Sequence, residues 1–183
     1  MLTYGLGDEA ELRLLQLHHA QALFDLTQAN RAHLRQWLPW VDGVKTAEDT
    51  QNFIRGTLLQ LSKDSSLNLG IWYRGQLAGT LGTHSINWTN RKTEIGYWLG
   101  EAFIGKGLMT TAVRALADYL FFELNLNRLE IRAATGNRKS CAIPERLGFR
   151  LVGVAKDAEW LYDHFVDHAI YEMLARDWQK TSA

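Results

Sequence analysis

A single segment near the middle of the chain constrains the fold more than any other. Residues 92–99 alternate apolar side chains with polar or small ones, which is typical of a half-buried strand. The turn Gly105-Lys-Gly107 follows, and residues 108–123 then show apolar side chains at helical spacing. The segment therefore predicts a strand, a sharp glycine turn and a long helix in direct succession.

This succession suits the binding of a phosphate. Two glycines let the backbone turn sharply and approach a ligand closely. The first N–H groups of a helix have no partner within it and lie at the positive end of its dipole, so they bind a phosphate without any special side chain. The same residues also fit a bare turn between a strand and a helix, and the glycines alone leave both interpretations open.

The rest of the chain predicts further blocks of strands and helices. Thr46 and Asp49 form a capping box that opens one of the helices. The helix before residues 128–135 favours a parallel strand pair at that point, whereas the turn at Arg74-Gly75 predicts an antiparallel hairpin. We expect strands at 11–17, 67–73, 76–87, 92–99, 128–135, 149–155 and 166–175, and helices at 20–38, 46–63, 108–123 and 140–147. The order predicts an α/β (α+β) fold with a mixed, mostly antiparallel sheet and helices on both faces.

Size and charge limit the class of protein. The chain has 183 residues, of which 46% are hydrophobic, so we expect one domain over residues 1–183 that folds without a disulfide or a metal. Lys and Arg number 20, as do Asp and Glu, and this balance argues against a surface that coats nucleic acid. The histidines show no spacing typical of metal ligands, and we expect no metal.

The sequence also suggests a cellular compartment. Cys141 is the only cysteine, which excludes an internal disulfide and suits a reducing environment. The first residues lack the basic start and apolar core of a signal peptide, and the apolar stretches are too short to cross a bilayer. We expect a cytoplasmic protein that contacts no membrane.

Several motifs follow one another in a fixed order along the chain. They are Glu94-Ile-Gly-Tyr-Trp-Leu-Gly-Glu101, Gly105-Lys-Gly-Leu-Met-Thr110, Asn137-Arg-Lys-Ser140, Glu145-Arg-Leu-Gly-Phe149 and, earlier in the chain, Arg31-Ala-His-Leu-Arg-Gln-Trp-Leu-Pro-Trp40. Together they resemble the GNAT superfamily of acetyltransferases, and within it the RimJ/RimL type, the ribosomal-protein N-terminal acetyltransferases. The resemblance extends from the first expected strand to the last. It implies a six- or seven-stranded sheet with a central splayed strand pair, and a transfer of acetyl from acetyl-CoA to a primary amine.

The resemblance also implies where acetyl-CoA binds. Its pantetheine arm is expected along residues 95–99, where backbone amides near Trp98 and Leu99 would polarise the thioester carbonyl. Its pyrophosphate is expected on the backbone of the glycine turn, and Asn137 is expected to contact the arm. The implied cofactor-binding residues are Trp98, Leu99, Ile104, Gly105, Lys106, Gly107, Leu108, Met109, Thr110, Asn137 and Ser140.

Two residues are candidates for the chemistry. By resemblance, Ser140 would protonate the departing thiolate, and Glu159, in Ala-Glu-Trp-Leu, would be the general base. Plainer interpretations stay open, since Ser140 would also serve as a helix cap and Glu159 as a surface carboxylate. Cys141 suits a small core residue better than a nucleophile, because direct attack by an amine needs no covalent intermediate.

The acceptor is less defined by the sequence. Trp37 and Trp40 would line its groove or pack in the core. A protein N-terminus, in particular that of a ribosomal protein, is the first choice, because an α-amine with a pKa of about 8 needs only a modest base. A polyamine, an aminoglycoside or an amino acid is the alternative. The sequence leaves the oligomeric state open, and since dimers are common in the subgroup a homodimer is one of the states it implies.

Three positions depart from the family pattern. Ile104 stands where the family usually has Gln or Arg, so a side-chain contact is lost while the backbone cradle stays. Met109 replaces a small residue. Pro144 falls inside the short helix, which is tolerated in the first turn if Ser140 is the N-cap.

Two other functions compete with an acetyltransferase. Gly100 to Gly107 is one residue from a nucleotide-binding P-loop, but Gly107 lacks the hydroxyl that would bind magnesium. A non-catalytic module that binds acyl-CoA would keep the phosphate cradle without an acid or a base. Ser140 and Glu159 argue against such a module.

Overall fold

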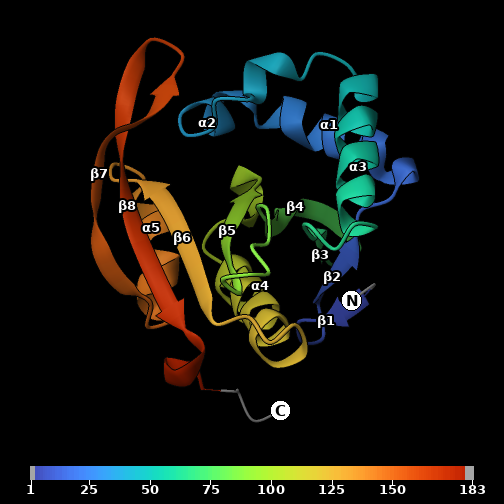
Figure 1. Cartoon of the computed structure of the whole chain (residues 1–183). Helices are drawn as coiled ribbons and strands as arrows, with labels where there is room; N and C mark the ends of the chain where they lie inside the picture. The colour runs from blue at the N-terminus through green and yellow to red at the C-terminus, as the bar shows by residue number, and fades with distance from the viewer. Residues whose placement is uncertain (1–2, 180–183) are drawn as a thin grey trace.

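One sheet of eight strands runs through the molecule (Figure 1). The computed structural model describes residues 3–179, so the first two residues of the N-terminal segment considered above and the last four of the chain lie outside it. The strands are β1 (Thr3–Gly5), β2 (Ala10–Leu14), β3 (Asn68–Tyr73), β4 (Gln76–Thr83), β5 (Lys92–Leu99), β6 (Arg128–Ala134), β7 (Arg150–Leu161) and β8 (His164–Leu174). Their order in the sheet is β1-β2-β3-β4-β5-β6-β8-β7. Only the β5–β6 pair is parallel, as the intervening helix predicts.

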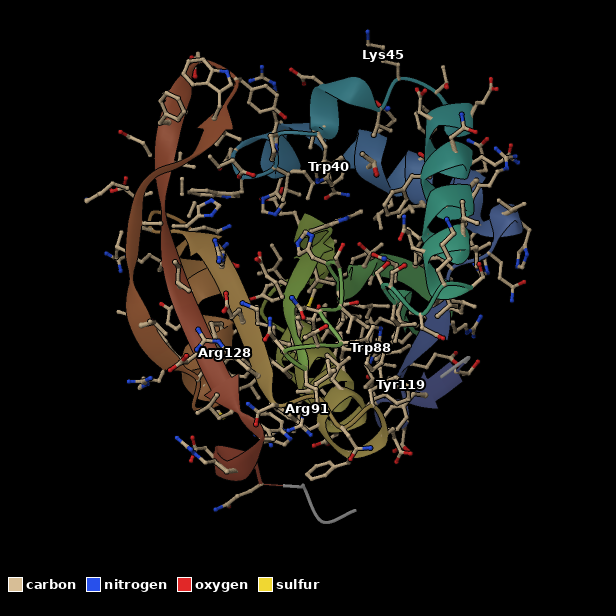
Figure 2. All side chains as sticks on the ribbon, viewed as in Figure 1. Trp40, Lys45, Trp88, Arg91, Tyr119 and Arg128 are labelled. Carbon is tan, nitrogen blue, oxygen red and sulfur yellow. The ribbon has the colours of Figure 1, made fainter. Side chains whose placement is uncertain are left out.

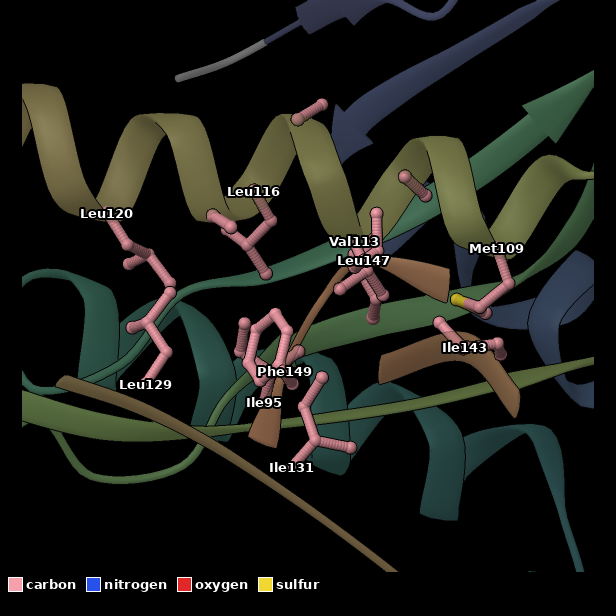
Figure 3. Packing of buried hydrophobic residues seen from close by; sticks show 14 of the residues in the cluster. Ile95, Met109, Val113, Leu116, Leu120, Leu129, Ile131, Ile143, Leu147 and Phe149 are labelled. Atoms are coloured by element: carbon pink, nitrogen blue, oxygen red, sulfur yellow. The ribbon is translucent and has the colours of Figure 1, made fainter. Parts of the chain in front are cut away.

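The helices cover both faces of this sheet. They are α1 (Ala20–Ala29), α2 (Arg31–Arg35), α3 (Ala47–Leu61), α4 (Leu108–Asp118) and α5 (Arg138–Arg146). The larger apolar cluster packs α4 and α5 against the central strands, with Val113 and Leu116 over Ile95 and Ile131 (Figure 3). A smaller cluster joins α1 and α3 to β3, through Leu23, Ile54 and Trp72 among others. No helix within residues 3–179 is long and apolar enough to span a membrane.

The helix starts follow local sequence signals. Thr46 Oγ1 accepts a hydrogen bond from Asp49 N (3.2 Å), and Asp49 Oδ2 accepts one from Thr46 N (2.8 Å), so the predicted capping box is confirmed. The helix expected over 20–38 is instead broken at Asn30. There the side chain accepts from Glu101 N (2.8 Å) and donates to Leu26 O (2.8 Å), which ends α1 and ties it to the residue after Gly100.

The strand prediction differs from the structure at both edges of the sheet. The sequence predicts six or seven strands, and the eighth is β1, whose three exposed residues show no apolar alternation. At the other edge, β7 continues to Leu161 because a bulge between Ala155 and Glu159 restores its pairing with β8.

Strands β5 and β6 separate halfway along their length. They pair only from Lys92 with Arg128 to Ile95 with Ile131. Beyond this point β5 continues beside β4, and β6 continues beside β8, which leaves a wedge between the two halves of the sheet. The central splayed strand pair implied by the resemblance is therefore present.

Candidate active site

Two cavities meet at this wedge. The sheet cavity, about 680 Å³, lies between the open end of the sheet and the segment around α1–α3. The loop cavity, about 1050 Å³, lies beside the glycine turn and the start of α5. The two cavities share six of their lining residues, which we call the junction: Trp37, Leu38, Tyr97, Trp98, Asn137 and Ser140.

The loop cavity is built around the predicted glycine turn. Gly105 and Gly107 have φ values of +82° and +75°, a left-handed conformation that other residues rarely adopt, which explains the two glycines. Gly107 is the N-cap of α4 without a side-chain cap, and the first helical hydrogen bond runs from Thr111 N to Gly107 O (3.1 Å). The N–H groups of residues 108–110 precede that bond and are available to an anion.

Most of the residues expected to bind the cofactor line this cavity. They are Trp98, Leu99, Ile104, Gly105, Gly107, Leu108, Met109, Thr110, Asn137 and Ser140. Lys106 is outside the lining, with its ammonium 5.8 Å from the centre of the Tyr73 ring. Basic side chains of His33, Arg138, Lys139 and Arg146 also line the cavity, and Arg146 donates to Thr110 Oγ1 (3.2 Å). The cavity therefore combines backbone donors with positive charge, a combination that fits a diphosphate.

The direction of the β5 backbone decides which amides face the wedge. Glu94 O accepts from His84 N (2.8 Å) and Gly100 N donates to Ala78 O (2.8 Å), so these even-numbered residues bond toward β4. Backbone groups alternate along a strand. The N–H groups of Tyr97 and Leu99 consequently point into the wedge, whereas that of Trp98 points toward β4.

The start of α5 corrects two expectations. Asn137 is the N-cap, and its Oδ1 accepts from Ser140 N (3.2 Å). Ser140 is therefore the third residue of the helix rather than its cap, because the helix begins at Arg138. Pro144 is the seventh residue, beyond the first turn, and cannot donate to the carbonyl four residues earlier, that of Ser140. Tyr97 takes that place, since its hydroxyl donates to Ser140 O (3.1 Å).

Glu159 lines the sheet cavity together with His168. The bulge in β7 is stabilised by Asp167, which accepts from Asp157 N (3.0 Å) and from Lys156 Nζ (2.7 Å). Beyond the bulge Glu159 pairs with Val166 and shares a face with His168, so that Glu159 Oε2 lies 3.5 Å from His168 Nε2. The two side chains are 33% and 17% exposed, which leaves the carboxylate accessible from the cavity.

Both predicted tryptophans line the sheet cavity. Trp37 belongs to the junction. The ring of Trp40, which Figure 2 labels, lies 6.1 Å from that of Trp98. The β7–β8 turn packs against the segment that carries these tryptophans. Tyr162 OH donates to Leu38 O (2.6 Å), and the Arg35 guanidinium lies 3.8 Å from the centre of the Tyr162 ring.

Sequence reasoning missed a group of polar side chains in the sheet cavity. Arg132 Nε lies 3.2 Å from Glu94 Oε2, and His84 Nε2 lies 3.8 Å from Glu94 Oε1. His168 and Tyr97 were missed as well. Glu94 and Tyr97 lie within the motif of residues 94–101, but His84, Arg132 and His168 come from other segments of the sheet. The strand register brings the whole group together, and no local motif marks it as a group.

The fold and the two cavities define a class of enzyme. A splayed parallel pair, followed by a glycine turn and an uncapped helix start, is the arrangement that the GNAT resemblance implies. The family model described as an acetyltransferase (GNAT) domain matches residues 10–150, and the chain belongs to this family.

Particular relatives narrow the type. The chain is 36% identical to a putative ribosomal N-acetyltransferase, YdaF, of Bacillus subtilis, over 98% of both proteins. It is 30% identical to the ribosomal-protein-serine acetyltransferase of Escherichia coli, over 92% of this chain and 94% of the relative. A solved structure of RimL, a ribosomal L7/L12 α-N-protein acetyltransferase in complex with coenzyme A, aligns with a TM-score of 0.91 at 30% identity, covering 94% of this chain and 97% of RimL. The structure of the microcin C7 self-immunity acetyltransferase MccE, solved with acetyl-CoA and AMP, aligns with a TM-score of 0.88 at 30% identity, covering 92% of this chain and 94% of MccE.

The chain is thus an acetyl-CoA-dependent N-acetyltransferase of the ribosomal-protein acetyltransferase type. The NTPase and the non-catalytic binding module are set aside by this assignment. Among residues 3–179, no group of three or more His, Cys, Asp or Glu side chains could hold a metal ion. Cys141 is buried in the larger core cluster, as its core interpretation expects.

Proposed function

We propose that this enzyme acetylates the N-terminal α-amine of a protein, with ribosomal proteins as the first candidates. The observation that carries the proposal is the meeting of two cavities at the junction: a loop cavity suited to acetyl-CoA and a separate sheet cavity open to an amine. The names of the relatives support this choice, because two of them are described as ribosomal acetyltransferases.

The donor is proposed to lie in the loop cavity. The uncapped N–H groups at residues 108–110 and the glycine turn would hold the pyrophosphate, and the pantetheine arm would follow β5. Leu99 N–H is the better candidate to polarise the thioester carbonyl, because it points into the wedge while the Trp98 N–H points toward β4. Asn137 is proposed to contact the arm as well as to cap α5.

The reaction needs one proton acceptor and one proton donor. The amine nitrogen attacks the thioester carbon, and Glu159 accepts the proton that leaves nitrogen, directly or through a water. The carbon–sulfur bond then breaks with its electron pair on sulfur, and Ser140 protonates that thiolate. Ser140 regains a proton from solvent while Glu159 releases one, so the products are the amide and free coenzyme A.

The charges of the sheet cavity favour a chain terminus over a polyamine. Glu94 and Glu159 are the two carboxylates of its lining, but Arg132 pairs with Glu94, and His84 and His168 lie beside them. A strongly acidic pocket that would hold several ammonium groups is therefore not formed by these residues. The aromatic wall of Trp37 and Trp40 suits the side chains of a peptide.

A panel of acceptors tests the proposal. Release of the coenzyme A thiol is measured with peptides that begin with Ser or Ala, with the same peptides blocked at the α-amine, and with spermidine, and mass spectrometry locates the acetyl group. We expect turnover only with free α-amines. Turnover with spermidine and not with peptides would show that the acceptor is a polyamine.

Three broader features are proposed alongside this activity. We propose that residues 1–183 form one catalytic domain, because strands from both ends of the described chain complete a single sheet. The free thiol of Cys141 supports a cytoplasmic location. The edge strand β7 exposes Leu151 and Val154, which supports a homodimer, and sedimentation of the purified chain tests it.

A further inference from the structure

Two side chains form hydrogen bonds with the backbone of Ser140. Its N–H donates to Asn137 Oδ1 (3.2 Å), and its carbonyl accepts from Tyr97 OH (3.1 Å). In a regular helix that carbonyl would accept from the residue four positions later. That residue is Pro144, which has no N–H, so the proline leaves the carbonyl free for the tyrosine.

Tyr97 remains a hydrogen-bond donor to Ser140 O throughout the working range of pH. Burial raises the pKa of its phenol above the ordinary value, so the hydroxyl stays protonated over the working range of pH. The ring packs against the larger core cluster, which fixes its direction. Tyr97 also belongs to the junction and lines both cavities, as Ser140 does.

The bond joins two elements whose relative position matters for the chemistry. Tyr97 belongs to β5, whose N–H groups at 97 and 99 point into the wedge, and Ser140 belongs to the first turn of α5. Forty-three residues separate the two along the chain. A shift of α5 along the wedge would move the Ser140 hydroxyl relative to any thioester held on β5, and the Tyr97 bond opposes such a shift.

We propose that Tyr97 is a positioning residue that, together with Pro144, sets the Ser140 hydroxyl at the sulfur of the thioester. The proposal rests on the proposed role of Ser140 as the proton donor. Tyr97 acts through the backbone of Ser140 and transfers no proton itself. Loss of its hydroxyl therefore slows departure of the thiolate and leaves the affinity for coenzyme A nearly unchanged.

The first test replaces the hydroxyl alone. Tyr97→Phe is compared with the parent enzyme in single-turnover release of the coenzyme A thiol, and calorimetry measures coenzyme A binding. We expect the rate to fall by about tenfold to a hundredfold, because small displacements of a catalytic group have effects of that order. The dissociation constant of coenzyme A should stay within about twofold, since backbone groups dominate the proposed binding.

A matched control is available on the same helix. Tyr171 OH, from β8, donates to Glu145 Oε1 (2.8 Å) near the end of α5, and Tyr171 lines neither cavity. Tyr171→Phe removes a bond between sheet and helix of the same kind, at Glu145 and beside the Cys141 thiol rather than at the backbone of Ser140. We expect a similar fall in Tm and a rate within about twofold of the parent. Equal rate losses in the two variants would mean that any sheet–helix bond has this effect, and would overturn the proposal.

A second variant tests whether the rate depends on the link between Tyr97 and α5 or only on the Ser140 carbonyl having a hydrogen-bond donor. In Tyr97→Phe/Pro144→Ala, the new N–H at position 144 can donate to Ser140 O within the helix. We expect this double variant to regain the Tm that Tyr97→Phe loses, but not the rate, because the link to β5 is still missing. Recovery of the rate together with the Tm would overturn the proposal.

A double-mutant cycle with Ser140→Ala completes the test. If Tyr97 acts through the Ser140 hydroxyl, Tyr97→Phe should slow the parent but have little further effect in Ser140→Ala. Additive losses would overturn the proposal. A parent that releases no thiol in response to any amine contradicts the proposed function instead, and the same cycle is then run on amine-independent hydrolysis of acetyl-CoA, with the same expected coupling.

Discussion

At the scale of single residues, the two proposed proton-transfer groups occupy different positions relative to the cavities. Glu159 lines the sheet cavity, whereas Ser140 belongs to the junction and lines both. A base for the amine is needed only where the amine enters, and an acid for the thiolate is needed where the two substrates meet. The positions of the two residues fit this division.

Removal of the charge from Glu159 tests the base. We expect Glu159→Gln to lower kcat by about a hundredfold or more, because general-base catalysis contributes on that order, and to leave coenzyme A affinity within about twofold. Steady-state kinetics and calorimetry measure the two quantities. Glu123→Gln, an exposed residue just beyond the end of α4, is the matched control and should keep the parent's kcat. Equal losses of kcat and of coenzyme A affinity in Glu159→Gln would contradict the assignment.

The capping carboxylate of α3 makes stability depend on pH. Hydrogen bonds from the Lys45 and Thr46 backbone lower the pKa of Asp49 below its ordinary value of 3.8. A lowered pKa contributes stability that is fully present above the unfolded value and is lost as the pH falls through the folded one. We therefore expect Asp49→Asn to have a lower Tm than the parent at pH 7, and the difference to shrink below about pH 4. A Tm difference that grows on acidification would contradict this linkage.

At the scale of elements, the glycine turn depends on backbone conformation. Gly107 and Gly148 share a left-handed conformation, with φ of +75° and +78°, but only Gly107 begins the helix beside the loop cavity. We expect Gly107→Ala and Gly148→Ala to lower Tm similarly, since the strain is the same, roughly 1–2 kcal/mol. Only Gly107→Ala should also weaken coenzyme A binding, by about tenfold, as calorimetry would show. Weakened binding in both variants would point to a global effect of strain.

Elements with strong local signals were predictable from the sequence, and those set by distant contacts were not. The Thr46 capping box and the strand–turn–helix succession are local, and both occur as expected. The break at Asn30 depends on a bond to Glu101, seventy-one residues away, which no local pattern records. The sequence predicts a start of α5 at residue 140, later than the observed start at Arg138, because Asn137 and Ser140 are both good caps and only the geometry shows that Asn137 takes this role. The Glu159–His168 contact follows from a bulge, and single-sequence reasoning does not foresee bulges.

At the scale of the whole molecule, two contacts hold the halves of the sheet on either side of the wedge in place. The short parallel pairing of β5 with β6 joins the two halves of the sheet at the base. The β7–β8 turn meets the segment after α2 across the sheet cavity, through Tyr162 and Leu38 (Figure 1). The second contact borders the proposed acceptor site and is distant in sequence from the glycine turn.

This contact should affect the acceptor more than the donor. We expect Tyr162→Ala, which removes the bond to Leu38 O and the ring beneath Arg35, to raise the KM for a peptide amine by about tenfold. Coenzyme A affinity should stay within about twofold. Phe165→Ala, on the same hairpin but packed on Trp160, is the control and should leave both constants near those of the parent. A larger change in coenzyme A affinity than in the peptide KM would contradict this division of the site.

The proposed donor site presents main-chain amides at the start of α4, whereas the proposed acceptor site is lined by side chains such as those of Trp40, Glu94 and Arg132. Main-chain geometry survives most substitutions, while a wall of side chains changes with each one. The two halves of the specificity are therefore separable. A library randomised over the residues of the sheet-cavity lining other than the junction and Glu159 is expected to change which amines are accepted while the proposed acetyl-CoA site stays intact.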